Sequence, residues 1–89
     1  MRIDKYLKVT RIIKRRTLAK EVTESERILV NDKIVKPSYQ VKLNDIITIE
    51  FGNKDVKIKV LSIDPLTKKA EANSMYELVS ETAKNIKSE

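Results

Sequence analysis

The sequence predicts an α+β domain: two N-terminal helices packed on a small, twisted, mostly antiparallel sheet, with a helix at the C-terminal end. Three patterns support this prediction. Apolar residues recur at helical spacing in the first quarter of the chain, apolar and polar residues alternate between residues 28 and 60, and helical spacing returns after residue 66. The 89 residues suit one domain, which we place at residues 1–65, followed by an extension over residues 66–89.

The first helix is expected to run for roughly three turns from residue 3. Its apolar stripe consists of Ile3, Tyr6, Leu7, Thr10 and Ile13. The opposite, polar side carries Asp4, Lys5, Lys8 and Arg11. Asp4 falls in the first turn, where a carboxylate favours the helix dipole. We expect this role for Asp4, with the orientation of an arginine through a charge-assisted pair as the alternative.

A second helix is expected at about residues 15–24. Lys14, Arg15 and Arg16 interrupt the first apolar pattern, and a new one starts with Leu18, Ala19 and Val22. This arrangement places Arg15 and Arg16 at a helix N-terminus, where backbone N–H groups add to the attraction for phosphate.

Short strands follow. The apolar segments 28–30 and 34–35 flank Asn31-Asp32, residues that tolerate the positive φ of a tight hairpin, and Pro37 ends the second strand or keeps it at an edge. Residues 39–43 are expected to be extended. The clearest hairpin joins segments 47–51 and 56–60 around Gly52-Asn53, with Lys57 and Lys59 pointing away from the core.

The C-terminal helix is expected at about residues 70–86, because apolar residues recur there near helical spacing without Gly or Pro. Tyr76 is expected to help seal the core beside Met75 rather than to stack on a base.

Charge is concentrated at one end of the chain. Residues 1–20 carry eight basic side chains and one acid, a net charge of +7, whereas the remaining 11 basic and 12 acidic residues give −1. A polyanion is the natural partner of such a pole, because each phosphate contact releases a condensed counterion. The candidate RNA-binding residues are Arg2, Lys5, Lys8, Arg11, Lys14, Arg15, Arg16 and Lys20. The arginines rank first, because a guanidinium meets phosphate oxygens bidentately.

Composition argues against several classes of protein. The chain has no Cys and no His, so it lacks the usual general base, thiolate nucleophile and commonest metal ligand. We therefore expect neither an enzyme nor a cofactor nor a metal site. No apolar run reaches the roughly 20 residues of a membrane span, and no apolar segment typical of a signal peptide follows the basic N-terminus, so we expect a cytoplasmic protein.

Two basic helices followed by a small sheet, with RIDKYL at residues 2–7, resemble the alpha-L RNA-binding motif, the ribosomal-protein-S-four-type domain. Residues 16–22 (RTLAKEV) resemble its second helix, residues 28–31 (ILVN) its first strand and turn, and residues 41–46 (VKLNDI) a later turn. Glu26, Asp32 and Asn44 depart from the family by standing where it commonly has glycine, and Glu26 would carry the largest penalty if positive φ is required there.

A closer resemblance covers nearly the whole chain. The run MRIDKYLKVTRIIKRRTLAKEV at residues 1–22, the length, and Thr67-Lys68-Lys69 followed by Met75-Tyr76 resemble the RqcP family, stand-alone alpha-L proteins related to heat-shock protein fifteen. The resemblance implies a factor of bacterial ribosome-associated quality control, and we expect the protein to be a monomer. It would bind large-subunit rRNA and peptidyl-tRNA on the stalled large ribosomal subunit, and stabilise the P-site tRNA while RqcH directs C-terminal alanine tailing. The resemblance also implies that Arg2, Arg15 and Arg16 contact RNA.

Three other functions remain as alternatives. One is a general recycling factor of the heat-shock type, acting on large subunits that carry peptidyl-tRNA. Another is a helix-turn-helix DNA-binding protein, although the third helix of that motif is missing before the predicted sheet. The last is an enzyme, which the absence of any nucleophile-and-base pair disfavours.

Overall fold

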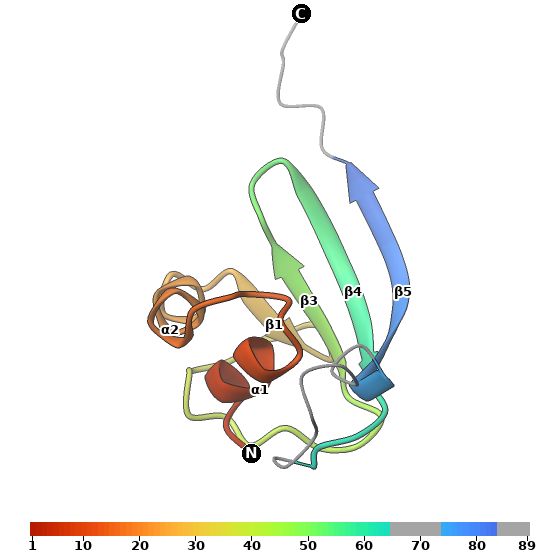
Figure 1. Cartoon of the computed structure of the whole chain (residues 1–89). Coiled ribbons are helices and arrows are strands. Elements are labelled where there is room, and N and C mark those ends of the chain that lie inside the picture. Colours follow the sequence, from red (N-terminus) through yellow and green to blue (C-terminus); the bar gives the residue numbers. More distant parts are fainter. Residues whose placement is uncertain (65–73, 84–89) are drawn as a thin grey trace, which may run out of the picture.

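Two helices lie against a five-stranded antiparallel sheet in the computed structural model, which describes residues 1–64 and 74–83 (Figure 1). The elements are α1 (Ile3–Val9), α2 (Arg16–Glu24), β1 (Ile28–Val30), β2 (Lys33–Ile34), β3 (Ile46–Glu50), β4 (Lys54–Val60) and β5 (Tyr76–Ala83). The strand order is β2-β1-β3-β4-β5, and every neighbouring pair is antiparallel. The α+β class and the order of the first six elements agree with the sequence prediction.

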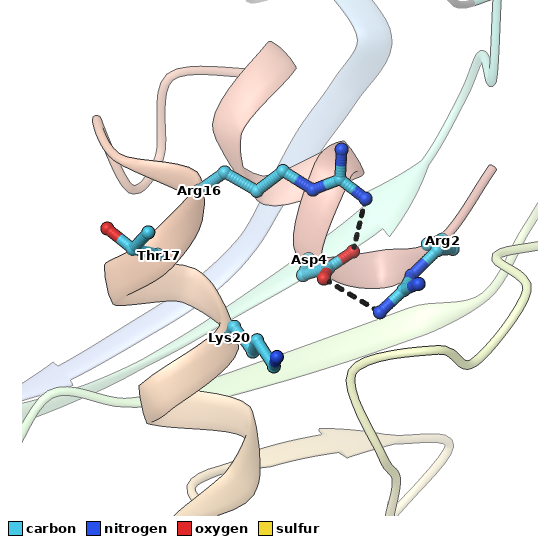
Figure 2. Close-up of a pocket in the computed structure, with 5 residues that line it drawn as sticks. All are labelled: Arg2, Asp4, Arg16, Thr17 and Lys20. Atoms are coloured by element: carbon cyan, nitrogen blue, oxygen red, sulfur yellow. Dashed lines mark hydrogen bonds and ion pairs between the residues drawn. The ribbon is translucent and has the colours of Figure 1, made fainter.

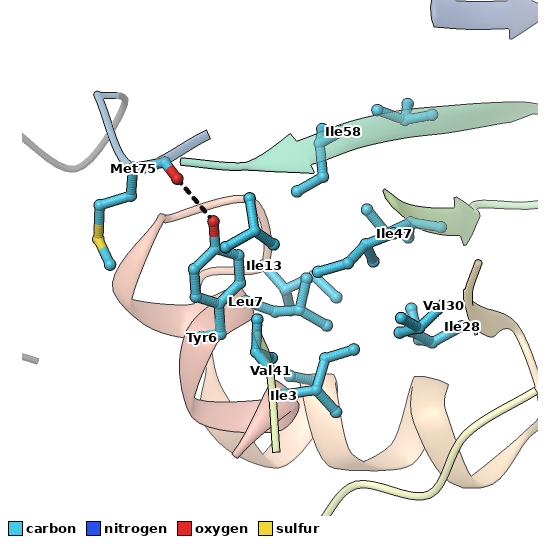
Figure 3. Close-up of a cluster of buried hydrophobic side chains, with 14 residues drawn as sticks. Ile3, Tyr6, Leu7, Ile13, Ile28, Val30, Val41, Ile47, Ile58 and Met75 are labelled. Carbon is cyan, nitrogen blue, oxygen red and sulfur yellow. Dashed lines mark hydrogen bonds between the residues drawn. The ribbon is translucent and has the colours of Figure 1, made fainter. Parts of the chain in front are cut away.

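The core lies between α1 and the sheet (Figure 3). All five residues of the predicted helical stripe are buried, with exposed fractions between 0 and 4%. They pack against alternate residues of β1, β3 and β4, the side chains of Ile28, Val30, Ile47, Ile49, Val56, Ile58 and Val60. The Tyr6 hydroxyl donates a 2.8 Å hydrogen bond to the carbonyl of Met75, which ties α1 to the start of β5. Burial raises the pKa of the Tyr6 phenol, so that it stays a donor.

The first helix is shorter than the roughly three turns expected. It ends at Val9 because Arg11 adopts φ 64° and reverses the chain, while the Thr10 hydroxyl donates to the carbonyls of Tyr6 and Leu7. The second helix begins at Arg16 and buries Ala19 and Thr23. Its Leu18, expected on the apolar side, is instead 47% exposed.

Both predicted hairpins are present. Asn31 and Asp32 have φ of 52° and 69°, the positive values that a two-residue turn between Val30 and Lys33 requires. Gly52, with φ 95°, turns the chain between β3 and β4. Behind the first hairpin, the Asp45 carboxylate accepts hydrogen bonds from Asn31 Nδ2 (3.2 Å), the Tyr39 hydroxyl (2.9 Å) and the backbone N–H of Lys42 (2.9 Å).

Residues 39–43 are less regular than the alternating pattern predicted. The segment forms one antiparallel bridge, between Gln40 and Arg2, and is not a strand of the sheet. Val41 is buried, but Leu43 is 55% exposed because the chain turns at Asn44, where φ is 71°.

The predicted C-terminal helix is wrong over Tyr76–Ala83, which form strand β5 paired with the whole length of β4. Ser74 and Met75, directly before the strand, have a 3₁₀ conformation, and residues 70–73 and 84–86 of that prediction lie outside the described residues. Val79 is the extra residue of a β-bulge opposite Lys57 and Ile58, and this bulge obscures the alternation in the sequence. The open edge of β4 offers backbone hydrogen bonds to the segment, and such pairing overrides local helical spacing. Tyr76 packs partly buried against the core, as expected.

Glu26 gives a test of backbone strain. It occupies the left-handed position after α2 with φ 63°, and Glu26 N–H and Arg27 N–H donate to the carbonyls of Thr23 and Val22, as in a Schellman motif. Glu26→Gly should raise the free energy of unfolding by about 1 kcal/mol, because glycine adopts this φ without a steric penalty. Urea denaturation measures the change. Glu24→Gly, within the helix, is the control and should lower the free energy of unfolding. If both variants lower it, Glu26 is not strained at this position.

The bond between Tyr6 and Met75 gives a second test. Tyr6→Phe should lower the free energy of unfolding by about 1–2 kcal/mol, because the buried carbonyl of Met75 loses its donor. Tyr76→Phe is the matched control and should change stability little. If urea denaturation gives the same change in the free energy of unfolding for Tyr6→Phe and Tyr76→Phe, the hydrogen bond of Tyr6 does not contribute to stability.

Candidate nucleic-acid interface

The eight basic candidate residues all lie at or near the surface formed by α1, α2 and their connection. Lys5 is half-buried and the other seven are exposed. Arg2 directly precedes α1, Arg15 caps α2 without a side-chain hydrogen bond, and Arg16 is the first residue of α2. The N-terminal placement of Arg15 and Arg16 agrees with the sequence prediction.

A buried carboxylate lies at the centre of this surface (Figure 2). Asp4 is only 2% exposed. Its Oδ2 accepts from Arg2 Nη2 at 3.2 Å, and its Oδ1 lies 3.7 Å from Arg16 Nη2 and accepts from the backbone N–H of Lys5 at 2.7 Å. The expectation that Asp4 lies on the polar, solvent side of α1 is therefore wrong. The alternative role, orienting arginines through charge-assisted pairs, is the one that the geometry supports.

Pairing with Asp4 leaves both arginines accessible. Their side chains keep exposed fractions of 43% for Arg2 and 50% for Arg16, so the arginine of each ion pair reaches the surface although the carboxylate is buried. Each guanidinium has five N–H donors in a planar fork, and a single carboxylate oxygen occupies only a small part of it. The remaining donors can bind an external anion.

Two hollows adjoin this arrangement and share Arg2 and Arg16. The first, of about 300 Å³, also touches Asp4, Thr17 and Lys20. Lys20 points from α2 towards the same space as the two guanidinium groups, whereas Thr17 points away (Figure 2). The second hollow, of about 410 Å³, is lined by Met1, Arg2, Lys5, Arg16, Gln40 and Ile63.

The structure thus brings together four of the eight predicted residues: Arg2, Lys5, Arg16 and Lys20. Lys8, Arg11, Lys14 and Arg15 are exposed but do not line these hollows. Sequence reasoning missed Gln40 and Ile63, which reach the site only through folding of the chain. The one local signal was for Asp4, an acid isolated among eight basic residues.

Among the residues that the structure describes, no group of three or more Asp and Glu side chains is arranged to hold a metal ion. In the same part of the chain, no helix has the length and apolar character that crossing a membrane requires. The helix α2 leads directly into β1, so the third helix of a helix-turn-helix is absent from this position.

Comparison with known proteins identifies relatives over nearly the whole length. A model of the S4 domain matches residues 1–47. The RQC P-site tRNA stabilizing factor of Streptococcus pneumoniae is 56% identical over 82 residues, covering 92% of this chain and 93% of that protein. The factor of the same name from Bacillus subtilis is 49% identical over 81 residues, covering 91% and 94%.

More distant relatives share the fold. Heat shock protein 15 of Escherichia coli is 35% identical over 83 residues, which cover 92% of this chain but 62% of that protein. The trimeric structure of Vibrio cholerae heat shock protein 15 superposes with a TM-score of 0.81 at 28% identity, covering 90% of this chain and 82% of that one. The chain therefore belongs to the S4-domain family and, within it, to the family of RQC P-site tRNA stabilizing factors.

Proposed function

We propose that this protein binds the stalled large ribosomal subunit through rRNA and peptidyl-tRNA, and stabilises the P-site tRNA during ribosome-associated quality control. In this role it supports C-terminal alanine tailing that depends on RqcH, and it catalyses no reaction itself. The names of the relatives at 47–56% identity support the tRNA-stabilizing part of the proposal. RqcH and the tailing reaction are expectations from the resemblance noted in the sequence.

The observation that carries the proposal is the pair of half-exposed arginines held on one buried carboxylate. Structured RNA is recognised mainly by its shape, its phosphates and its 2′-hydroxyls, because its deep major groove excludes side chains. Forked guanidinium donors at a fixed separation suit such a backbone. The other basic candidates add attraction that depends on ionic strength.

A binding experiment tests the site. We expect Arg15→Ala/Arg16→Ala to weaken binding to purified large subunits carrying a P-site peptidyl-tRNA, and to lower the slope of log affinity against log salt by about 1.5. The slope falls because two phosphate contacts release fewer counterions. Lys57→Ala/Lys59→Ala removes the same charge from the outer face of the sheet and is the control. The assignment fails if the arginine variant keeps wild-type affinity and slope, or if the two variants are equally affected.

A tailing reaction separates the proposed role from general recycling. Large subunits with peptidyl-tRNA, alanyl-tRNA and RqcH should form long alanine tails with the protein and short or no tails without it. If tail length is unchanged but release of peptidyl-tRNA changes, the recycling role of the heat-shock type is favoured instead.

We further propose that the free protein is a monomer. The net charge of +6 on 89 residues, concentrated on one surface, opposes association of that surface with itself. Light scattering at physiological salt should then give a mass close to 10.3 kDa. A mass about three times larger would instead match the trimeric relative from Vibrio cholerae.

A further inference from the structure

We infer that Asp4 is the positioning residue of the RNA-binding surface: its carboxylate holds Arg2 and Arg16 so that their free donors face the same RNA backbone segment. This inference rests on the proposed function. It predicts that removing the charge of Asp4 changes RNA affinity in the direction opposite to simple electrostatics. Removing a negative charge from a surface that binds a polyanion should strengthen binding by simple electrostatics. At Asp4 we expect the opposite, because the loss of orientation outweighs the removed repulsion.

The geometry of the carboxylate supports this role. Asp4 is 2% exposed, so its own oxygens make little direct contact with solvent or ligand. The two oxygens are divided between the partners, with Oδ2 on Arg2 and Oδ1 near Arg16. One carboxylate therefore joins the residue that precedes α1 to the first residue of α2. An ionised group buried to this degree requires compensating charge, which keeps both guanidinium groups close to it.

The positions of the arginines make their orientation useful. Both line the two hollows, one of which also contains Lys20 and the other Lys5. Without Asp4, two long and half-exposed side chains would sample many rotamers, and ordering them on binding would cost free energy. With Asp4 in place, part of that ordering is complete before RNA arrives. The inferred ligand is the phosphodiester backbone that passes over the two hollows.

Asp4→Asn is the central variant, because it preserves the shape of the side chain and removes its charge. The probe is the purified large subunit carrying a P-site peptidyl-tRNA, titrated over a salt series. We expect affinity to fall about tenfold, which corresponds to about 1.4 kcal/mol. The salt slope should stay unchanged, because the same cations contact phosphate. The matched control is Glu21→Gln, which removes an exposed carboxylate from α2 and should leave affinity equal to or slightly above wild type.

A double-mutant cycle shows whether Asp4 acts through an arginine. Arg16→Lys keeps the charge but loses the planar fork, and should weaken binding more than Arg15→Lys, whose residue has no pair with Asp4. In the Arg16→Lys background, Asp4→Asn should weaken binding by clearly less than tenfold, because the group that it orients is already altered. Circular dichroism and urea denaturation confirm that each variant is folded before titration. If Asp4→Asn unfolds the protein, the comparison of Arg16→Lys with Arg15→Lys decides the question, and equal weakening by the two would overturn the inference.

The outcomes separate the inference from the proposed function. If the wild-type protein does not bind the loaded subunit, the proposed function fails. If wild type binds and folded Asp4→Asn binds equally well or more tightly, the proposed function stands and the positioning role of Asp4 is wrong. Strict additivity of Asp4→Asn with Arg16→Lys would likewise overturn the part of the inference that concerns Arg16.

Discussion

The packing of α1 against the sheet is the interaction on which the rest of this structure depends. The side chains of Ile3, Tyr6 and Leu7 are fully buried, and burial of each large apolar side chain contributes about 1.5–3 kcal/mol. The chain buries only about two thirds of the surface exposed when unfolded, so its core is small and this contribution is a large share of the total. The bond from Tyr6 to Met75 then fixes the start of β5 against the same helix.

This packing also determines the geometry of the basic surface. Because Ile3 and Leu7 face the core, Asp4 is held at the boundary between α1 and α2, where water has little access. A buried carboxylate is unfavourable unless cations compensate it. Arg2 and Arg16 supply that compensation from opposite sides (Figure 2). The requirement to neutralise one acid thus arranges two arginines, and these are the residues that we propose bind RNA.

Several turns of the chain place residues other than glycine in the left-handed backbone region. Within residues 1–64 and 74–83, five residues other than glycine have positive φ: Arg11, Glu26, Asn31, Asp32 and Asn44. Asn and Asp tolerate this region because their short polar side chains can bond to the nearby backbone. The Asn31 side chain also donates a hydrogen bond to Asp45, 14 residues further along the chain. Arg11 and Glu26 lack that compensation and follow the two helices directly. The turn at Arg11 lies in the connection from α1 to α2, and the turn at Glu26 leads from α2 into β1.

The sequence by itself determined the elements whose signals are local. The stripe on α1, the start of α2, the turn at Asn31-Asp32 and the cationic N-terminal quarter follow from spacing and residue type within a few positions. Local sequence also explains why the family resemblance and the RNA-binding class were predictable, since both depend on those features.

Only the tertiary structure decided the burial of Asp4, the gathering of four basic residues into adjoining hollows, and the strand at Tyr76–Ala83. Each depends on residues distant in sequence. Asp4 becomes buried when α2 packs beside α1, and β5 forms because β4 offers an unpaired edge whose hydrogen bonds outweigh a weak helical preference. The periodicity of a sequence reflects the local conformational preference of each segment. The free energy of pairing between distant segments depends on the tertiary structure and cannot be seen in that periodicity.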